Sequence, residues 1–218
     1  MHSTIVLSRL SLYRWLITSL VFLVVVALIP LSAGAQPYIP LPMQPGFEGG
    51  RVLSGAAIEY ASPATADLDK DGKQEIIIGG IDGKIHALRS DGSVLWVFDA
   101  TASINAMAPR PGGSRIDSAP AVADLDWDGW PEVVVAVGAP ASVLGYNGGI
   151  VVLDHLGRLR PGWPRVGSDQ MGPNMGGPDG YLEGFYSSPA IGDLDGDGDL
   201  EIVAGGWDMR VYAWHHDG

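Results

Sequence analysis

After residue 50, short runs of small, β-branched and apolar residues alternate with glycine-rich turns, and the same order of runs occurs three times. Val- and Ile-rich runs of this length between turns are typical of β-strands. No amphipathic helical stretch is predicted after the N-terminal segment. The expected first strands of the units are 61–66, 118–123 and 187–192, and the expected second strands are 75–80, 132–138 and 201–206. The expected third strands are 84–89, 149–154 and 210–215, and the expected fourth strands of the first two units are 93–98 and 159–166.

Four short strands per unit, repeated along the chain, describe the blades of a β-propeller. The predicted fold class is therefore all-β, with about three blades of four antiparallel strands, the last incomplete, preceded by an N-terminal signal helix. The repeat region is 51–218, with blades at about 55–112, 113–168 and 182–218. Known propellers usually close with at least four blades. We therefore expect a fragment of a longer protein, the alternative being a complete chain that closes by self-association.

The N-terminal segment has the features of a secretory signal peptide. Arg9 and Arg14 precede an apolar run over 15–31, and small residues surround Ala35. This order predicts a signal peptide over 1–35, cleaved after Ala35. An uncleaved anchor is the alternative, because the apolar run is near the lower limit for spanning a bilayer. Residues 36–50, rich in Pro and Gly, read as an extended leader.

Charge and cysteine content narrow the class of protein further. The formal net charge is −12, and removal of the two signal-peptide arginines would make it −14. Such an acidic chain is not expected to bind nucleic acid, and we expect membrane contact only through an uncleaved signal anchor or a missing C-terminal anchor. The chain has no cysteine, which excludes disulfides and thiolate metal sites. Bound ions are then a candidate means of stabilisation outside the cell.

Each unit places the same acidic loop between its first and second strands. Counted from the first aspartate, carboxylates stand at positions 1, 3, 5 and 9, and glycine stands at position 6. Alternate carboxylates in a curled loop gather hard oxygen ligands, which are those that Ca²⁺ prefers. We predict about three Ca²⁺ sites, with position 7 contributing a backbone carbonyl. The candidate ligands are Asp67, Asp69, Asp71, Lys73 and Glu75; Asp124, Asp126, Asp128, Trp130 and Glu132; Asp193, Asp195, Asp197, Asp199 and Glu201.

Two other interpretations of these loops were weighed. An EF-hand loop requires an acidic residue at position 12 between helices. Position 12 here is Ile78, Val135 or Ala204, in the middle of an expected strand, so that reading fails three times. The other alternative is a solvated acidic turn without an ion. The glycine at position 6 is expected to adopt the sharp backbone turn, and the leucine at position 2 to anchor each loop on its sheet.

The motif Asp-x-Asp-x-Asp-Gly-x-x-Glu, preceded by Ser-Pro-Ala and followed by Ile-Val-x-Gly-Gly, resembles the FG-GAP or VCBS repeat of integrin α-like propellers. Val137-Gly-Ala-Pro followed by Gly148-Gly-Ile-Val-Val-Leu is similar to the segment that names the repeat. The resemblance covers 61–218 and implies Ca²⁺ ions that stabilise the hairpins on one face of a propeller. Glu at position 9, where the integrin pattern more often has Asp, is a departure that bacterial-type members share.

Residues 82–98 also resemble a blade of quinoprotein-type propellers, in which a tryptophan packs between neighbouring blades. We expect Trp96 and Trp163 to do the same. No nucleophile elbow, zinc-protease helix or phosphate-binding glycine loop is present, so no catalytic or cofactor-binding residue is predicted. Trp127, Trp130 and the glycine-rich stretch 166–184 are candidate recognition elements, and the alternative for the stretch is a disordered connector.

These observations predict a secreted or cell-surface calcium-binding propeller that acts as a binding or adhesion module for an extracellular protein or glycan. Two alternatives stay open at this point. One is the propeller portion of an extracellular enzyme such as a polysaccharide lyase. The other is a purely structural calcium-stabilised module. The chain itself is expected not to be an enzyme.

Overall fold

The computed structural model describes residues 43–53, 57–108, 111–138, 145–168 and 181–218. These residues belong to one compact unit, Met43–Gly218. The predicted signal peptide and the first part of the predicted leader lie outside the described residues. Within the described part of the chain, no helix has the length and apolar character needed to cross a membrane.

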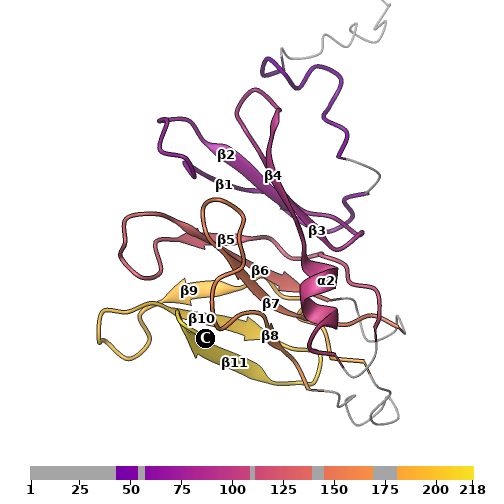
Figure 1. Ribbon diagram of the computed structural model, residues 1–218, viewed down its shortest axis with the longest axis vertical. Coiled ribbons are helices and arrows are strands. Elements are labelled where there is room, and N and C mark those ends of the chain that lie inside the picture. The colour runs from indigo at the N-terminus through magenta and orange to yellow at the C-terminus, as the bar shows by residue number, and fades with distance from the viewer. Residues whose placement is uncertain (1–42, 54–56, 109–110, 139–144, 169–180) are drawn as a thin grey trace, which may run out of the picture. The chain divides into compact units, whose positions relative to one another are not determined.

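Three antiparallel sheets, formed by consecutive strands, make up most of the described chain (Figure 1). The first contains β1 (Ala64–Ala66), β2 (Glu75–Gly79), β3 (Lys84–Leu88) and β4 (Val94–Asp99). The second contains β5 (Ala121–Ala123), β6 (Glu132–Val137), β7 (Gly149–Leu153) and β8 (Arg165–Val166). The third contains β9 (Ala190–Gly192), β10 (Glu201–Gly205) and β11 (Val211–His215). The predicted all-β fold of blade-like sheets is confirmed, and the third sheet has three described strands.

The first strand of each sheet is shorter than predicted, because a proline precedes it. Proline has no amide hydrogen and cannot donate to a strand ladder. In the second and third sheets, the side chain of a serine two residues before the proline bonds the neighbouring second strand instead. The Ser118 hydroxyl donates to the Ala136 carbonyl at 2.7 Å, and the Ser187 hydroxyl donates to the Gly205 carbonyl at 3.1 Å.

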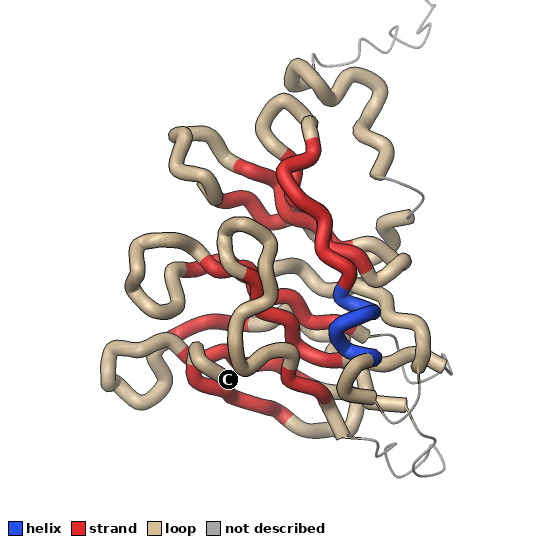
Figure 2. The backbone as a smooth tube through the Cα atoms, viewed as in Figure 1, coloured by secondary structure: helices blue, strands red, loops and turns tan. Residues whose placement is uncertain are grey.

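The expectation of no helix after the N-terminal segment was wrong. A short helix, α2 (Ala100–Asn105), follows β4 directly and is drawn in blue in Figure 2. Asp99 caps it by accepting the Ala102 amide at 3.1 Å. Ala100 and Ile104 are its buried residues. Six residues are too few to show a helical hydrophobic period, and the Asp99 cap lies just after the predicted strand 93–98.

The fourth strand of the second sheet is also shorter than the predicted 159–166. Only Arg165–Val166 forms β8, and Leu159 makes an isolated bridge to Leu153. Two prolines, at 161 and 164, lack amide donors, and Gly162 between them has a left-handed φ of 84°. The backbone therefore leaves the sheet between the bridge and β8.

The second sheet is buried on both faces, because alternate residues of its central strands pack into two different cores. Val133, Val135 and Val137 of β6 lie in a core shared with the first sheet and α2. Val134 and Ala136 lie in a core shared with the third sheet. Every residue of β6 and β7 is buried. Each buried Val or Ile contributes about 1.5–3 kcal/mol, so these strands are the most heavily stabilised part of the described chain.

The leucine at loop position 2 anchors two of the three loops. Leu68 is fully buried in the first of these cores, and Leu125 is 1% exposed in the second. Leu194, in contrast, is 60% exposed, so the prediction of an anchor was wrong for the third loop. The partner of each buried leucine is the next sheet in the sequence, and no described sheet follows the third one.

Trp96 and Trp163 connect neighbouring sheets, as predicted. The Trp96 Nε1 donates to the His155 carbonyl in the β7–β8 turn at 3.0 Å. The Trp163 Nε1 donates to the His216 carbonyl after β11 at 3.3 Å. Gly157 lies against Trp96 so closely that a Cβ there would be 2.6 Å from the indole. The first two sheets therefore each carry, near their fourth strand, an indole that binds the corresponding turn of the following sheet.

A buried aspartate joins the end of the second sheet to the third. Asp208, 6% exposed, accepts the Ser168 hydroxyl at 2.8 Å, the Arg210 guanidinium at 3.1 Å and the Tyr212 hydroxyl. Burial raises the pKa of this carboxyl, but the hydrogen bonds outweigh it and the pKa is lowered below its usual value. The ionised form of Asp208 therefore stabilises the fold.

Asp208→Asn should lower the free energy of unfolding by about 1.5–3 kcal/mol at neutral pH, because a charged acceptor with three side-chain donors is lost. Since the folded pKa of Asp208 lies below the usual value of an aspartate, this contribution is complete above the unfolded pKa and is lost as pH falls through the folded pKa. Urea unfolding at pH 7 and at stepwise lower pH measures it. Asp217→Asn, at an exposed position, is the control. If the difference in unfolding free energy between the wild type and Asp208→Asn stays constant down to pH 2.5, the assignment is wrong.

Candidate metal centres

The three acidic loops connect β1 to β2, β5 to β6 and β9 to β10, and they lie at the same side of the sheets (Figure 1). Each loop is closed by the same hydrogen bond, from the glycine amide at position 6 to the carboxylate Oδ2 at position 1. The three distances are 3.0 Å for Gly72 to Asp67, 2.9 Å for Gly129 to Asp124 and 3.2 Å for Gly198 to Asp193. The repeated sequence therefore folds into a repeated geometry.

Two further backbone amides orient the carboxylates. The amide at position 5 donates to the carboxylate at position 3, at 3.3 Å in every loop. The amide at position 7 donates to the carboxylate at position 5, at 2.8, 2.7 and 2.9 Å in the order of the loops. The backbone amide at position 7 thus orients a carboxylate, whereas the backbone carbonyl at this position stays a predicted ligand. The side chain at position 7 makes different contacts in each loop. In the first loop, the Lys73 ammonium pairs with the Asp71 carboxylate at 3.0 Å.

The glutamate at position 9 has a role that the spacing did not reveal. Glu75, Glu132 and Glu201 are buried, with exposures of 1%, 1% and 5%. In each, Oε2 accepts the backbone amide of the leucine at position 2, at 2.8, 2.9 and 2.7 Å. One carboxylate oxygen therefore closes the loop, and only Oε1 is left for a cation. The signal in the sequence was an acidic residue at the first position of a buried strand.

The backbone is left-handed at two places in each loop. The glycines at position 6 have φ of 84°, 90° and 97°, which matches the predicted sharp turn. Position 4 is also left-handed, in Lys70 with φ 59°, in Trp127 with φ 58° and in Gly196 with φ 80°. Non-glycine residues rarely adopt this conformation. The first two loops therefore hold a strained residue where the third has glycine.

Three carboxylates in each loop come close enough to share one ion. In every set the candidate ligand atoms lie within 4.8 Å of one another. Two oxygens that bind the same Ca²⁺ at about 2.3–2.6 Å can be at most about 5 Å apart. The Oδ1 atoms of Asp67 and Asp124 are buried without a hydrogen-bond partner, so each is available to an ion. The sets are Asp67, Asp69 and Asp71; Asp124, Asp126 and Glu132; Asp193, Asp195 and Asp197.

The electrostatics of the loops also favour a cation. Burial raises the pKa of Glu75, and the neighbouring loop aspartates raise it further. Burial raises the pKa of Glu132 to about 7, although the Leu125 amide and the Arg160 guanidinium act in the opposite direction. A bound cation would offset both the burial of the glutamate and the repulsion among the carboxylates.

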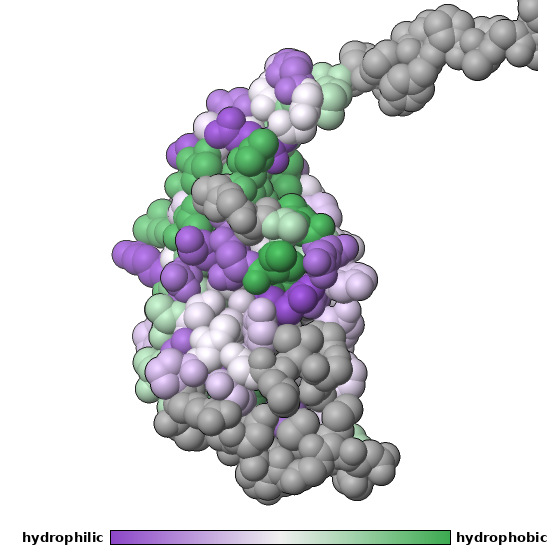
Figure 3. Space-filling view, turned by 90° about the vertical axis from the view of Figure 1, so that its right-hand side faces the viewer, coloured by the Kyte–Doolittle hydropathy of each residue, from purple (hydrophilic) through white to green (hydrophobic). Residues whose placement is uncertain are grey.

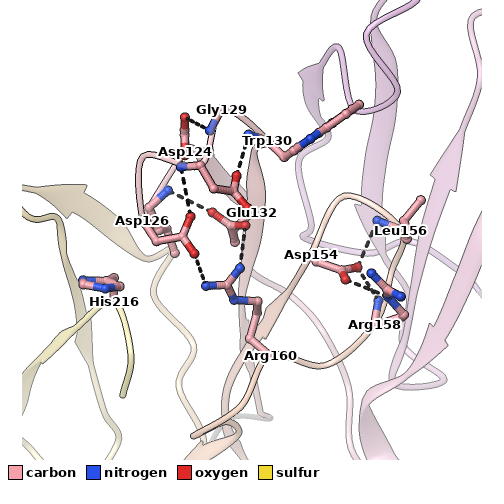
Figure 4. Close-up of polar contacts among 12 residues, drawn as sticks. Asp124, Asp126, Gly129, Trp130, Glu132, Asp154, Leu156, Arg158, Arg160 and His216 are labelled. Carbon is pink, nitrogen blue, oxygen red and sulfur yellow. Dashed lines mark hydrogen bonds and ion pairs between the residues drawn. The ribbon is translucent and has the colours of Figure 1, made fainter.

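The loops differ in the side-chain cations that reach them. In the second loop, the Arg160 Nη2 lies 2.5 Å from Asp126 Oδ2 and its Nη1 lies 3.1 Å from Glu132 Oε1 (Figure 4). The hydrogen bond from Arg160 lowers the pKa of Asp126. In the third loop the His215 Nδ1 lies 3.0 Å from Glu201 Oε1, and this contact raises the pKa of His215. No feature of the loop motif itself indicated either contact.

The loops also contact one another. The Trp127 Nε1 of the second loop donates to the Gly198 carbonyl of the third at 2.9 Å. The Lys70 Nζ of the first loop lies 3.9 Å from the centre of the Trp130 ring, and Trp130 stacks on His155 at 4.2 Å. Trp127 nevertheless remains 64% exposed. The three loops therefore form one continuous acidic edge.

A comparison with protein families agrees with this geometry. The family model described as "FG-GAP-like repeat" matches residues 67–135. These residues are therefore similar to an FG-GAP-like repeat. The match begins at the first aspartate of the first loop and ends within β6, so it contains the first two acidic loops. The third loop repeats the FG-GAP-like spacing outside the matched residues.

Several solved structures resemble the chain at low sequence identity. The quinohemoprotein alcohol dehydrogenase ADHIIG from Pseudomonas putida is 20% identical, over 66% of this chain and 24% of its own, with a TM-score of 0.44. A europium-containing methanol dehydrogenase is 18% identical, over 70% and 31%, with a TM-score of 0.39. The V. cholerae biofilm matrix protein Bap1 is 22% identical, over 73% and 31%, with a TM-score of 0.30.

This chain thus spans about a quarter to a third of the length of those structures. A search of the curated proteins found no match.

Gly72→Ala should lower the free energy of unfolding by about 1–2 kcal/mol, because a left-handed φ is unfavourable once a Cβ is present. An added Cβ at Gly72 meets nothing within 4 Å, so the effect would come from the backbone alone. Gly192→Ala is the matched control, since its Cβ also meets nothing and its φ is not left-handed. Urea unfolding of both variants in chelator measures the difference. Equal stability of the two variants would refute the turn assignment.

Proposed function

We propose that the chain is part of a secreted or cell-surface propeller whose acidic loops bind Ca²⁺ and whose function is to bind an extracellular partner. The observation that carries the calcium assignment is the repeated geometry of the loops. In each, three carboxylates lie within 4.8 Å of one another, oriented by the same backbone hydrogen bonds. The secretory assignment rests on the sequence of residues 1–35.

The donor set favours calcium over other metals. All candidate side-chain ligands in the three sets are carboxylates, and the chain has no cysteine. Hard oxygen donors suit Ca²⁺ or Mg²⁺, whereas Zn²⁺ and Cu²⁺ prefer nitrogen and sulfur. A flexible loop that offers many oxygens suits Ca²⁺, since Mg²⁺ requires near-ideal octahedral geometry and retains several waters. Calcium is also the ion that the FG-GAP resemblance implies.

Calcium would act on the fold by joining two strands. The carboxylate at position 1 follows the first strand, and the glutamate at position 9 begins the second. An ion held between them, together with positions 3 and 5, would keep the loop closed and neutralise its repulsion. The expected role of the ion is therefore structural support of a binding scaffold.

Calcium should raise the melting temperature of residues 36–218, and chelator should lower it. At an ion concentration of 100 Kd, each site stabilises the native state by about 2.7 kcal/mol. Asp195→Asn should weaken calcium binding and reduce the calcium-dependent shift, whereas Asp91→Asn, an exposed acid in the β3–β4 turn, should not. Differential scanning fluorimetry across a calcium titration measures both. A melting temperature that does not respond to calcium or chelator would refute the assignment.

An aromatic hollow at the other end of the third sheet supports a binding role. The hollow has a volume of about 410 Å³ and includes Tyr186, Trp207 and Met209 in its lining. Trp207 and Met209 follow β10, whereas the acidic loop precedes that strand. Tyr60, 65% exposed, and Trp207 both pack against Tyr186, with ring centres 6.3 and 6.1 Å away. Hydrophobic residues also reach the surface on the side of the molecule shown in Figure 3.

Half-buried aromatic rings in a hollow suit a sugar ring or an apolar side chain, so the proposed partner is a glycan or a protein. Trp207→Ala should reduce binding to a panel of immobilised polysaccharides and extracellular matrix proteins at least about tenfold, the loss that corresponds to about 1.4 kcal/mol. Surface plasmon resonance in calcium measures it. Leu156→Ala, which alters an exposed apolar side chain in the β7–β8 turn, is the control. Equal binding by both variants would exclude the hollow as the binding site.

A further inference from the structure

The Arg160 side chain reaches into the second acidic loop, whereas the residue at the matching position of the first unit does not reach the first loop. Its guanidinium binds Asp126 at 2.5 Å and Glu132 at 3.1 Å, and both carboxylates belong to the candidate metal set of that loop. The side chain is only 23% exposed. Figure 4 shows the guanidinium directed from its strand segment into the loop, between these two carboxylates.

The backbone holds Arg160 firmly in this place. Its amide donates to the Val152 carbonyl of β7 at 2.9 Å, and its carbonyl accepts the Trp163 amide at 3.3 Å. The preceding residue, Leu159, makes the bridge to Leu153. Arg160 is therefore fixed beside β7, which pairs with β6, the strand that begins at Glu132. Its approach to the loop follows from the sheet rather than from a free surface side chain.

The first sheet has a different residue at the matching position. The turn after β3 and the turn after β7 close with the same backbone hydrogen bond, from Arg89 to Ser93 and from Asp154 to Arg158. The next residues, Val94 and Leu159, face the corresponding positions Leu88 and Leu153. One residue further, the equivalent of Arg160 is Leu95, which packs against the core. The first loop therefore receives no cation from this position.

The cations near the other two loops make weaker contacts. Lys73 touches one carboxylate of the first set and its side chain is 65% exposed, so solvent screens the pair. His215 binds Glu201, which is outside the set of the third loop, and its side chain is 61% exposed. The half-buried Arg160 guanidinium is different, because it stays charged at all relevant pH values and binds carboxylates through a rigid fork of donors. It can replace an ion.

We propose that Arg160 is the resident cation of the second acidic loop, so that this loop is held closed without a metal and Ca²⁺ binds only the first and third loops. The inference rests on the proposed function for those two loops. It replaces the sequence expectation of three equivalent calcium sites with two metal-dependent loops on either side of one that is neutralised by the protein itself. The guanidinium would repel an incoming divalent ion, and it already binds two of the three carboxylates that could hold the ion, Asp126 and Glu132.

The decisive test compares Arg160→Gln with the wild type and with Arg158→Gln. Arg158 lies two residues earlier, carries the same charge and is 70% exposed, but it binds Asp154 instead of the loop. Isothermal titration calorimetry on residues 36–218 should give two calcium ions per chain for the wild type and Arg158→Gln, and three for Arg160→Gln. In chelator, Arg160→Gln should melt at a lower temperature than both, and saturating calcium should close the gap.

The possible outcomes separate this inference from the proposed function. Three ions in the wild type, or two in Arg160→Gln, would overturn the role of Arg160 and leave calcium binding intact. No ion in the wild type would refute the proposed function for the first and third loops, and a single ion gained by Arg160→Gln would still support the role of Arg160. No ion in either protein would overturn both.

A second pair of variants keeps the test decisive if Arg160→Gln does not fold. Asp124→Asn and Asp193→Asn change the same position of the second and third loops, and neither aspartate contacts an arginine in the described pairs. Asp193→Asn should weaken one calcium site about tenfold or more, because a charged ligand is lost. Asp124→Asn should leave the number and affinity of the sites unchanged. Loss of a site in Asp124→Asn would overturn the inference.

Discussion

The structure depends on one hydrogen bond, repeated in each sheet and buried in the first two, that connects the acidic loop to the strand after it. The glutamate that begins the second strand is buried beneath the loop and accepts the amide at loop position 2. The same glutamate faces the last residue of the first strand, in the pairs Ala66 with Glu75, Ala123 with Glu132 and Gly192 with Glu201. Loop closure and strand register are thus set at a single residue, and a loop of fixed length must curl its carboxylates together.

Much of this could be predicted from the sequence, because it follows from local order. Short runs rich in Val and Ile between glycine turns indicated the strands, and glycine at position 6 indicated the turn of each loop. What escaped prediction depends on contacts between distant residues. Arg160 lies 28 residues after Glu132 and reaches it only because β7 pairs with β6. Leu194 matches Leu68 and Leu125 in sequence, yet its burial would need a neighbouring sheet. The helix α2 was too short to leave a periodic pattern.

Three near-identical motifs therefore have different environments. The first loop has a solvent-exposed lysine, the second a half-buried guanidinium and the third an exposed histidine beside its glutamate. The contacts from Lys70 to Trp130 and from Trp127 to Gly198 join these environments along one edge. A change in the charge of one loop would alter the contacts of the next loop, because the connecting side chains belong to the loops themselves. Sequence repetition sets the frame, and the flanking residues set the chemistry.

The indole contacts between sheets have a consequence for how such a chain can grow. Trp96 and Trp163 reach equivalent carbonyls, although two extra residues displace Trp163 along its distorted strand segment. Each middle unit thus carries a donor for the unit after it and an acceptor for the unit before it. A gene duplication that copies one whole unit would bring both halves of the joint with it. Lengthening by duplication would then require no new interface. A mutation that distorts one turn would first remove the hydrogen bond from the indole of the preceding unit.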